Sequence, residues 1–266
     1  MKYQRPLGTN DVTPESVGQW HDIEAVFADI CRRHSFGELR TPIFEDTDLF
    51  IRAVGDGTDI VSKEMYTFED RGGRSITLRA EGTAPAVRAY LENHLMEQDL
   101  ERVVKLYYIA PIFRYDRPQA GRYRQHTQFG LEIIGSPNPA ADAEIIQVAT
   151  EFYSAAGITT AKLKLNSVGC PACAPGYVQA VRDYATDYLP EMCEDCHRRY
   201  ELNPLRMIDC KNEACGRIMA DAPIMTDMLC SECDEHFAAV RECLTLLEID
   251  YELDPYIVRG LDYYTK

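Results

Sequence analysis

Eight of the ten cysteines of this 266-residue chain lie in four close pairs within one stretch of the sequence. A close pair places two sulfur atoms where they can bind the same tetrahedral metal ion, and two such pairs complete a site of four thiolates. Eight ligands would suit two structural zinc ions. The predicted ligands are Cys170, Cys173, Cys193, Cys196, Cys210, Cys215, Cys230 and Cys233.

The spacing does not tell which pairs share an ion, and it leaves other metal chemistry open. A catalytic zinc ion needs a position for water or substrate, which four sulfurs do not leave, so we favour a structural role. His197 could replace the sulfur of Cys196. An iron–sulfur cluster is a further alternative, although four separated pairs differ from the compact runs that hold such clusters. Cys31 and Cys243 lie on apolar helical stripes and are expected to be core thiols.

The chain is strongly acidic, with 43 acidic and 28 basic residues and a formal net charge of -15. This balance argues against a protein that coats nucleic acid nonspecifically, so a polyanion would have to bind a local basic patch. No stretch approaches eighteen consecutive apolar residues, and the first residues lack the apolar segment of a signal peptide. We expect a cytoplasmic protein whose cysteines are reduced rather than joined in a disulfide framework.

The spacing of apolar residues predicts an α+β fold with a largely antiparallel sheet and flanking helices. The two longest predicted strands should pair antiparallel, with an arginine-rich loop between them. The predicted elements are helices over residues 14–34 and 139–156 and after Gly82, strands over 37–45, 102–115, 125–135 and 161–167, and a hairpin around Gly72 and Gly73.

Three segments differ in character. Residues 1–167 carry most of the predicted strands and form the expected core. Residues 168–250 hold nine of the ten cysteines and form an expected cysteine-rich, zinc-binding insertion. Residues 251–266 read as a strand and a turn, and we expect them to return to the core.

The second long strand predicts a floor for a small polar ligand. Because side chains alternate along a strand, Phe129 and Leu131 share one face with other apolar residues, and that face belongs to the core. The opposite face carries Gln128, Gly130 and Glu132, which offer an amide, a gap without a side chain, and a carboxylate. A solvated outer face is the alternative interpretation.

Four arginines lie in or at the ends of the loop before this strand. Guanidinium groups can bind a phosphate through two parallel hydrogen bonds, so the group of Arg114, Arg117, Arg122 and Arg124 indicates an anionic ligand. A nucleotide next to an amino acid would match both the arginines and the carboxylate of the floor. Taken singly, each arginine is better explained as a solvated loop residue, and only the group indicates the anionic ligand.

Two further segments could contribute to the same site. Glu81 and Thr83 stand between a predicted strand and a helix, where Glu81 could pair with an ammonium group. Alternatively, these residues cap the helix by accepting hydrogen bonds from its amides. Arg259 precedes a turn and is followed by Tyr263 and Tyr264, which could instead be a packed strand end.

These segments together resemble the catalytic core of class II aminoacyl-tRNA synthetases and, within that class, the histidyl-tRNA synthetase family. Residues 40–50 resemble the first class II motif, and residues 107–135 resemble the second. Residues 257–265, IVRGLDYYT, are similar to the histidine-specific signature, and residues 203–212 are similar to the insertion domain of bacterial members. The resemblance covers nearly the whole chain, with the motifs in the order of the family.

The resemblance implies a role for each site residue in activating L-histidine with ATP and transferring it to tRNA(His). Glu81, Thr83 and Gln128 would hold the ammonium group, Glu132 would accept from the imidazole, and Tyr263 and Tyr264 would close the ring pocket. Arg114 and Arg122 would clamp the ATP phosphates, His126 would stack on adenine, and Arg259 would meet the α-phosphate, so that Arg114 and Arg259 are the catalytic residues. Arg117 and Gln119 would approach the tRNA acceptor end. Mg²⁺ would accompany the pyrophosphate, and the first motif would form a homodimer interface.

The sequence departs from the family pattern in three places. It ends at Lys266, before the third class II motif, so we expect an amino-terminal piece of the enzyme with little or no activity alone. His126 and Thr127 replace an aromatic residue followed by histidine, and Ala80 replaces a proline. The main alternative is the histidine-sensing regulatory subunit of ATP phosphoribosyltransferase, which shares this fold. A nucleic-acid-binding zinc ribbon is a third reading, which the acidic insertion disfavours.

Overall fold

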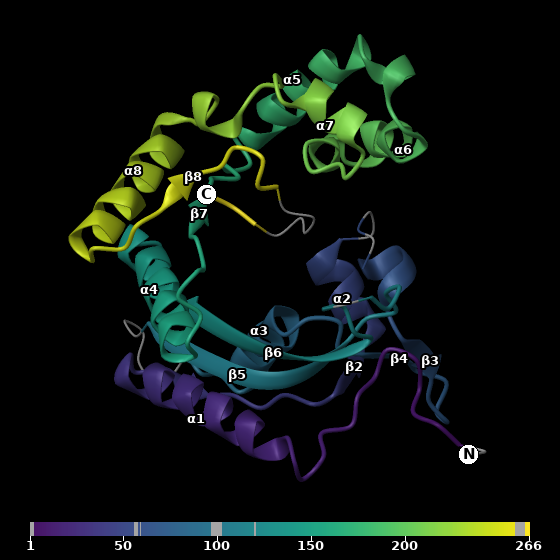
Figure 1. Cartoon of the computed structure of the whole chain (residues 1–266), viewed down its shortest axis with the longest axis vertical. Coiled ribbons are helices and arrows are strands. Elements are labelled where there is room, and N and C mark those ends of the chain that lie inside the picture. The colour runs from purple at the N-terminus through teal and green to yellow at the C-terminus, as the bar shows by residue number, and fades with distance from the viewer. Residues whose placement is uncertain (1–2, 56–57, 59, 97–102, 120, 259–263) are drawn as a thin grey trace. The chain divides into compact units, whose positions relative to one another are not determined.

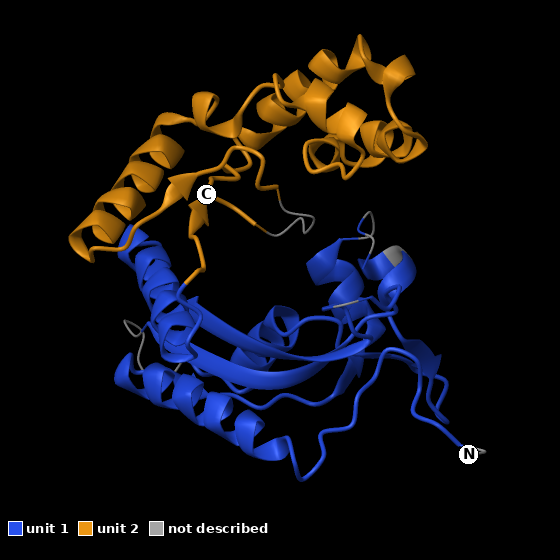
Figure 2. Cartoon of the chain, in the orientation of Figure 1, with its two compact units in different colours: residues 1–159 blue, residues 160–266 orange. Residues whose placement is uncertain are grey.

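The computed structural model describes residues 3–55, 58, 60–96, 103–119, 121–258 and 264–266. The chain divides into two compact units, Met1–Thr159 and Thr160–Lys266, which Figure 2 colours separately. The start predicted for the insertion, at residue 168, therefore lies inside the second unit. The return of residues 251–266 to the core stays a prediction. No helix in the described part of the chain is both long and apolar enough to cross a membrane.

A long pair of antiparallel strands forms the centre of the first unit (Figure 1). Strands β5 (Val104–Phe113) and β6 (Gln125–Ile134) pair along their full ten-residue lengths. Strand β1 (Gly37–Glu38) extends this sheet by pairing parallel to β5. The antiparallel pairing predicted for the two long segments is confirmed, and the sheet is mixed because of β1.

One face of this sheet packs against two helices, α1 (Val17–Arg33) and α4 (Pro139–Ala155). The apolar side chains of β6 on this face, including Phe129 and Leu131, pack against the core as predicted. Cys31 is fully buried there, and burial raises the pKa of its thiol to about 12, as expected for an inert core thiol. The buried core residues are Phe27, Ile30, Cys31, Phe36, Tyr107 and Val148.

A second, smaller sheet of the first unit contains three short antiparallel strands in the order β2, β4, β3. These strands are β2 (Phe44–Asp46), β3 (Thr67–Glu69) and β4 (Ser75–Leu78). The hairpin predicted around Gly72 and Gly73 joins β3 to β4 and is confirmed. The Asp70 carboxylate accepts hydrogen bonds from the N–H groups of Gly72 and Arg74, and Gly73 takes a φ of 75° that glycine adopts readily.

Helices α2 (Thr47–Val54) and α3 (Thr83–Glu92) complete the first unit, together with a π-helical turn over Ile60–Glu64. The helix predicted after Gly82 is thus confirmed. Residues 79–82 connect the end of β4 to the start of α3, and Glu81 lies in this short connection.

In the first unit, one predicted helix start and the extent of one predicted strand are wrong. Helix α1 begins at Val17 rather than residue 14, because the Thr13 carbonyl accepts hydrogen bonds from the N–H groups of Ser16 and Val17 and forms a turn first. The strand predicted over residues 37–45 is two strands in different sheets. Pro42 lies between them and has no N–H group to donate to a neighbouring strand.

The second unit consists mainly of short helices (Figure 1). Its only described sheet is the parallel pair of β7 (Lys164–Leu165) and β8 (Glu252–Leu253), which shortens the strand predicted over 161–167. The helices are α5 (Ala174–Thr186), α6 (Glu194–Leu202), α7 (Glu213–Met219) and α8 (Ser231–Leu246). Its core contains thiols and thioethers among the aliphatic and aromatic side chains, and the residues with little or no exposure include Tyr177, Val181, Cys196, Met207, Cys215, Met219 and Met225.

Candidate functional site

The face of β6 that points away from α1 and α4 carries the three positions of the predicted ligand floor. Gly130 is buried, and Gln128 and Glu132 are half-buried. This face is therefore not an open, solvated surface. A small apolar cluster beside the floor consists of Ala86 of α3 with Tyr108 and Ala110 of β5.

The amide oxygen of Gln128 is buried and accepts no hydrogen bond from any described residue. Buried polar atoms nearly always have a partner, because an unpaired one loses its hydration without compensation. Gln128 lies opposite Ala110, whose methyl group cannot supply a donor. The floor therefore presents an acceptor that an N–H donor of a ligand would satisfy.

Glu81 is 4% exposed, and its carboxylate is held by the start of α3. Its two oxygens accept hydrogen bonds of 2.7 Å from the backbone N–H groups of Thr83 and Ala84. This is the capping arrangement that the sequence left open. Burial nevertheless raises the pKa of Glu81, and the amide hydrogen bonds and the charge of Arg114 oppose that rise. The Thr83 side chain also forms a hydrogen bond with this carboxylate, whose remaining lone-pair capacity could serve a ligand.

Glu132 is a second carboxylate on this face. Its Oε1 atom accepts a hydrogen bond of 3.3 Å from the Tyr108 hydroxyl. Burial is the largest cause that raises the pKa of Glu132, and the negative charge of Glu81 adds to it. Hydrogen bonds with Thr83 and Tyr108 act in the opposite direction. The site thus brings a buried carboxylate, Glu81, and a half-buried one, Glu132, close enough to affect each other, an arrangement that favours a cationic ligand.

The gap predicted above Gly130 is not empty, which corrects the sequence interpretation. The ring of Tyr108, which is opposite Gly130 in the strand register, occupies it. A Cβ atom added at Gly130 would overlap this ring, and so would one added at Gly82. Both glycines therefore make room for one aromatic side chain. A ligand would lie over this ring rather than directly over the backbone of Gly130.

Arg114 follows β5 at the edge of the floor. Its Nε atom donates a hydrogen bond of 2.8 Å to the carbonyl of Ala80, which fixes the guanidinium beside the Glu81 segment. No described carboxylate forms an ion pair with it. His126, the second residue of β6, is half-buried. Burial and the positive charge of Arg114 lower the pKa of its imidazole, so we expect the ring to be neutral.

The other three arginines lie in the loop between β5 and β6, and each has different contacts there. The Arg124 guanidinium stacks on the Tyr115 ring, 3.8 Å from its centroid, and donates to the Asp116 carbonyl, so it supports the loop. Arg122 is exposed and lies 3.3 Å from an Asp116 carboxylate oxygen. Asp116 also accepts from the backbone N–H of Arg117.

The loop narrows at its tip, where the backbones of Gln119 and Arg122 pair. This pairing places Gln119 beside the turn. Three further predicted site residues lie outside the described part of the first unit. Arg259 and Tyr263 lie outside the described residues. Tyr264 belongs to the second unit, in which it is half-buried.

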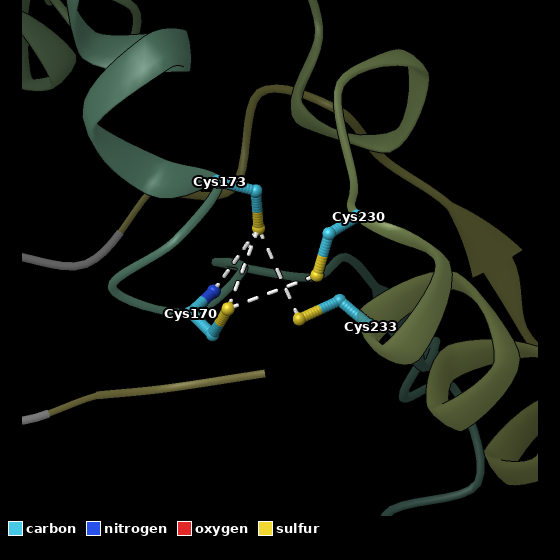
Figure 3. A group of neighbouring side chains, drawn as sticks. All are labelled: Cys170, Cys173, Cys230 and Cys233. Carbon is cyan, nitrogen blue, oxygen red and sulfur yellow. Dashed lines mark hydrogen bonds between the residues drawn. The ribbon is translucent and has the colours of Figure 1, made fainter.

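The second unit brings the eight paired cysteines into two groups of four. One group contains Cys170, Cys173, Cys230 and Cys233 (Figure 3), and the other contains Cys193, Cys196, Cys210 and Cys215. Within each group all sulfur atoms lie within 4.8 Å of one another. The first pair thus joins the fourth and the second joins the third, which the spacing left open. His197 belongs to neither group of described ligands.

The sulfur separations match a tetrahedral ion. The Sγ atom of Cys170 lies 3.8 Å from those of Cys173 and Cys230, and the Sγ atoms of Cys193 and Cys210 are also 3.8 Å apart. Four sulfurs at the usual zinc distance of about 2.3 Å would be separated by about 3.8 Å. The cysteines of each group are therefore already arranged to hold a metal ion.

Helix starts position these cysteines. Cys173, Cys193 and Cys230 immediately precede α5, α6 and α8, where free backbone N–H groups and the helix dipole favour a thiolate. Hydrogen bonds from the backbone N–H groups of Ala172 and Cys173 lower the pKa of Cys170 to about 7. The donor set therefore suits a cation that binds thiolates.

Known proteins resemble this chain over most of its length. The family described as Histidyl-tRNA synthetase matches residues 8–172, which include β5, β6 and the arginine loop. The chain belongs to the histidyl-tRNA synthetase family. The histidine–tRNA ligase of Pelotomaculum thermopropionicum is 54% identical over 261 residues, which are 98% of this chain and 61% of that protein. That of Desulforudis audaxviator is 53% identical over 266 residues, 100% of this chain and 63% of the relative.

A solved histidyl-tRNA synthetase has the same fold. The apo structure of the Staphylococcus aureus protein has a TM-score of 0.75 and 40% identity, covering 99% of this chain and 60% of that chain. A Bacillus halodurans structure titled an ATP phosphoribosyltransferase regulatory subunit/histidyl-tRNA synthetase has a TM-score of 0.69 and 19% identity, covering 99% of this chain and 70% of that one, which is a likeness of fold alone. The chain spans about three fifths of the length of the curated relatives it matches.

The overlap of Gly130 with Tyr108 gives a first prediction. We expect Gly130→Ala to lower the free energy of unfolding by about 1–3 kcal/mol, because the buried Tyr108 ring would have to move. Gly18→Ala is the matched control, since nothing lies within 4 Å of its added Cβ. Because Gly18 is the second residue of α1, that substitution should leave stability unchanged or raise it slightly. Urea unfolding followed by circular dichroism measures both, and a Gly130→Ala variant as stable as the wild type would contradict the packing.

Proposed function

We propose that this chain supplies the histidine- and ATP-binding part of a histidine–tRNA ligase. In the first step, an oxygen of the histidine carboxylate attacks the α-phosphorus of ATP, the bond to the β-phosphate oxygen breaks, and pyrophosphate leaves. In the second step, a terminal ribose hydroxyl of tRNA(His) attacks the carbonyl carbon of histidyl-adenylate, loses its proton, and AMP leaves. Neither step needs a covalent bond to the protein.

The unpaired, buried amide oxygen of Gln128 is the observation that carries this proposal. An α-ammonium group has three N–H donors and one positive charge. Gln128 would accept one hydrogen bond, and Glu81, held by the start of α3, would supply the countercharge. The hydroxyl of Thr83 would complete the ammonium site.

The imidazole would be recognised at the other end of the floor. Glu132 would accept a hydrogen bond from a ring N–H, and Tyr263 and Tyr264 would close the ring pocket. An amino acid without a ring N–H would bring no donor to the half-buried Glu132 and would cover it with an apolar ring, which disfavours its binding. The cost of burying this carboxylate without a donor from the ligand would provide the selectivity for histidine.

ATP would lie against the arginines at the edge of the floor. Arg114 and Arg122 would bind its phosphates, His126 would stack on adenine, and Arg259 would stabilise charge at the α-phosphate. Mg²⁺ would accompany the pyrophosphate and neutralise part of its charge. The rate would come from orientation of the two substrates and from these fixed positive charges.

The remaining partners follow from the same family membership. The loop residues Arg117 and Gln119 would approach the acceptor end of tRNA(His). A homodimer would form through the segment that contains β2, and the reaction would take place in the cytoplasm.

The two cysteine groups would each hold a structural zinc ion. Four thiolates fill a tetrahedral zinc ion and leave no place for substrate, so the ions would stabilise the second unit rather than react. Cys196 and Cys215 are fully buried in the core of that unit. Folding of these helices would therefore depend on metal.

A test of the proposed reaction is histidine-dependent exchange of pyrophosphate into ATP by the product of the complete reading frame that encodes this chain. We expect exchange with L-histidine and none with L-phenylalanine. Gln128→Ala should raise KM for histidine about 10- to 100-fold by removing a buried acceptor of a charged group, while KM for ATP stays unchanged.

Gln125→Ala is the matched control, because Gln125 is exposed at the start of the same strand. It should leave both KM values near those of the wild type. A wild-type protein without histidine-dependent exchange would contradict the proposal and favour a histidine-sensing role without catalysis.

The metal assignment predicts two zinc ions per chain in native mass spectrometry. Cys210→Ser should reduce the number to one, because it removes a ligand of one group only. Cys243→Ser is the control and should retain two, since Cys243 belongs to neither described group. A chelator should lower the melting temperature of the wild type. Two outcomes count against the assignment: a zinc-free protein, or visible iron–sulfur absorbance.

A further inference from the structure

We propose that Tyr108 is a positioning residue that holds the carboxylate of Glu132 for recognition of the imidazole ring, and so contributes to selectivity for histidine. This inference rests on the proposed function. It concerns a residue that the sequence patterns did not single out. Tyr108 contacts both Gly130 of β6 and Gly82 before α3.

The ring of Tyr108 is fixed from two sides. It projects from β5 between Gly130 of β6 and Gly82 at the start of α3, and a side chain at either glycine would overlap it. Tyr108 itself is 5% exposed. Two segments far apart in the sequence thus leave room for the same ring. Such tight packing allows one orientation of the phenol group.

The hydroxyl of this ring points at the acidic end of the floor. It donates to the Oε1 atom of Glu132 at 3.3 Å. Burial, followed by the charge of Glu132, raises the pKa of Tyr108, so the hydroxyl keeps its proton and remains a donor. A hydrogen bond with Thr83 also reaches this hydroxyl.

Tyr108 thus supplies one rigid donor to Glu132 and Thr83 supplies another, and the carboxylate keeps further lone pairs for a ligand. A half-buried carboxylate near Glu81 would otherwise rotate or take up a proton, because the two negative charges repel. In its ionised, fixed form Glu132 can accept from a ring N–H of histidine. Tyr108 acts through Glu132 and has no bond to break or form in the reaction.

The test is the Tyr108→Phe variant of the product of the complete reading frame, assayed by amino-acid-dependent pyrophosphate exchange. This substitution keeps the ring between the two glycines and removes the hydroxyl alone. We expect KM for L-histidine to rise about tenfold, as for loss of a hydrogen bond to a charged group, with KM for ATP unchanged. Discrimination against β-(2-thienyl)-L-alanine, whose ring has no N–H, should fall by a similar factor.

Tyr107→Phe is the matched control, because Tyr107 is the next residue and packs on the opposite face of the sheet with Phe27. It should change neither KM nor discrimination. A double-mutant cycle with Glu132→Gln measures the coupling, and the effect of Tyr108→Phe should largely disappear in that background. Circular dichroism verifies that each variant is folded. The spectrum of the metal-loaded wild type is the reference.

Three outcomes would overturn the inference. Wild-type kinetics in Tyr108→Phe, equal effects of the two tyrosine substitutions, or full additivity with Glu132→Gln would each show that Tyr108 does not act through Glu132. If Tyr108→Phe failed to fold, the hydroxyl would be required for the stability of the fold rather than for placing Glu132, and the positioning role would fall. Absence of histidine-dependent exchange in the wild type would instead remove the proposed function and this inference with it.

Discussion

The pairing of β5 with β6 is the constraint on which the first unit depends. Ten residues of each strand are held in one antiparallel register, so the side chains of β6 must alternate between two faces. One face is buried by α1 and α4. A shift of one residue would send Gln128 and Glu132 into that apolar core and expose Phe129 and Leu131. The core therefore fixes which polar groups face the other side.

That other face accumulates polar groups in a way that a purely structural surface does not require. It holds a buried amide oxygen without a partner and two carboxylates whose pKa values are raised by burial. Each of these features costs stability in the absence of a ligand. A ligand with an ammonium group and a ring N–H would satisfy all three groups together. The cysteine groups of the second unit are a parallel case, since four converging sulfurs are the ligands that a tetrahedral metal ion needs.

The sequence predicted the features that depend on local patterns. Alternation along β6 identified the core face and the polar face, and the glycine pair identified the β3–β4 hairpin. Close cysteine pairs predicted metal ligands, but their pairing depends on how α5 and α8 fold back, which spacing does not encode. The role of Gly130 was misjudged, because the residue that fills its space is on another strand. Tyr108 lies opposite Gly130 only because β5 and β6 pair in this register. The prediction that the two segments pair antiparallel did not include the register.

A crystal structure of the product of the complete reading frame with L-histidine bound tests the central claim most directly. We expect the ammonium nitrogen to lie about 3 Å from the amide oxygen of Gln128, the ordinary distance for a hydrogen bond, and the imidazole to face Glu132. Histidine bound elsewhere, with the Gln128 oxygen paired to a donor of the protein, would contradict it.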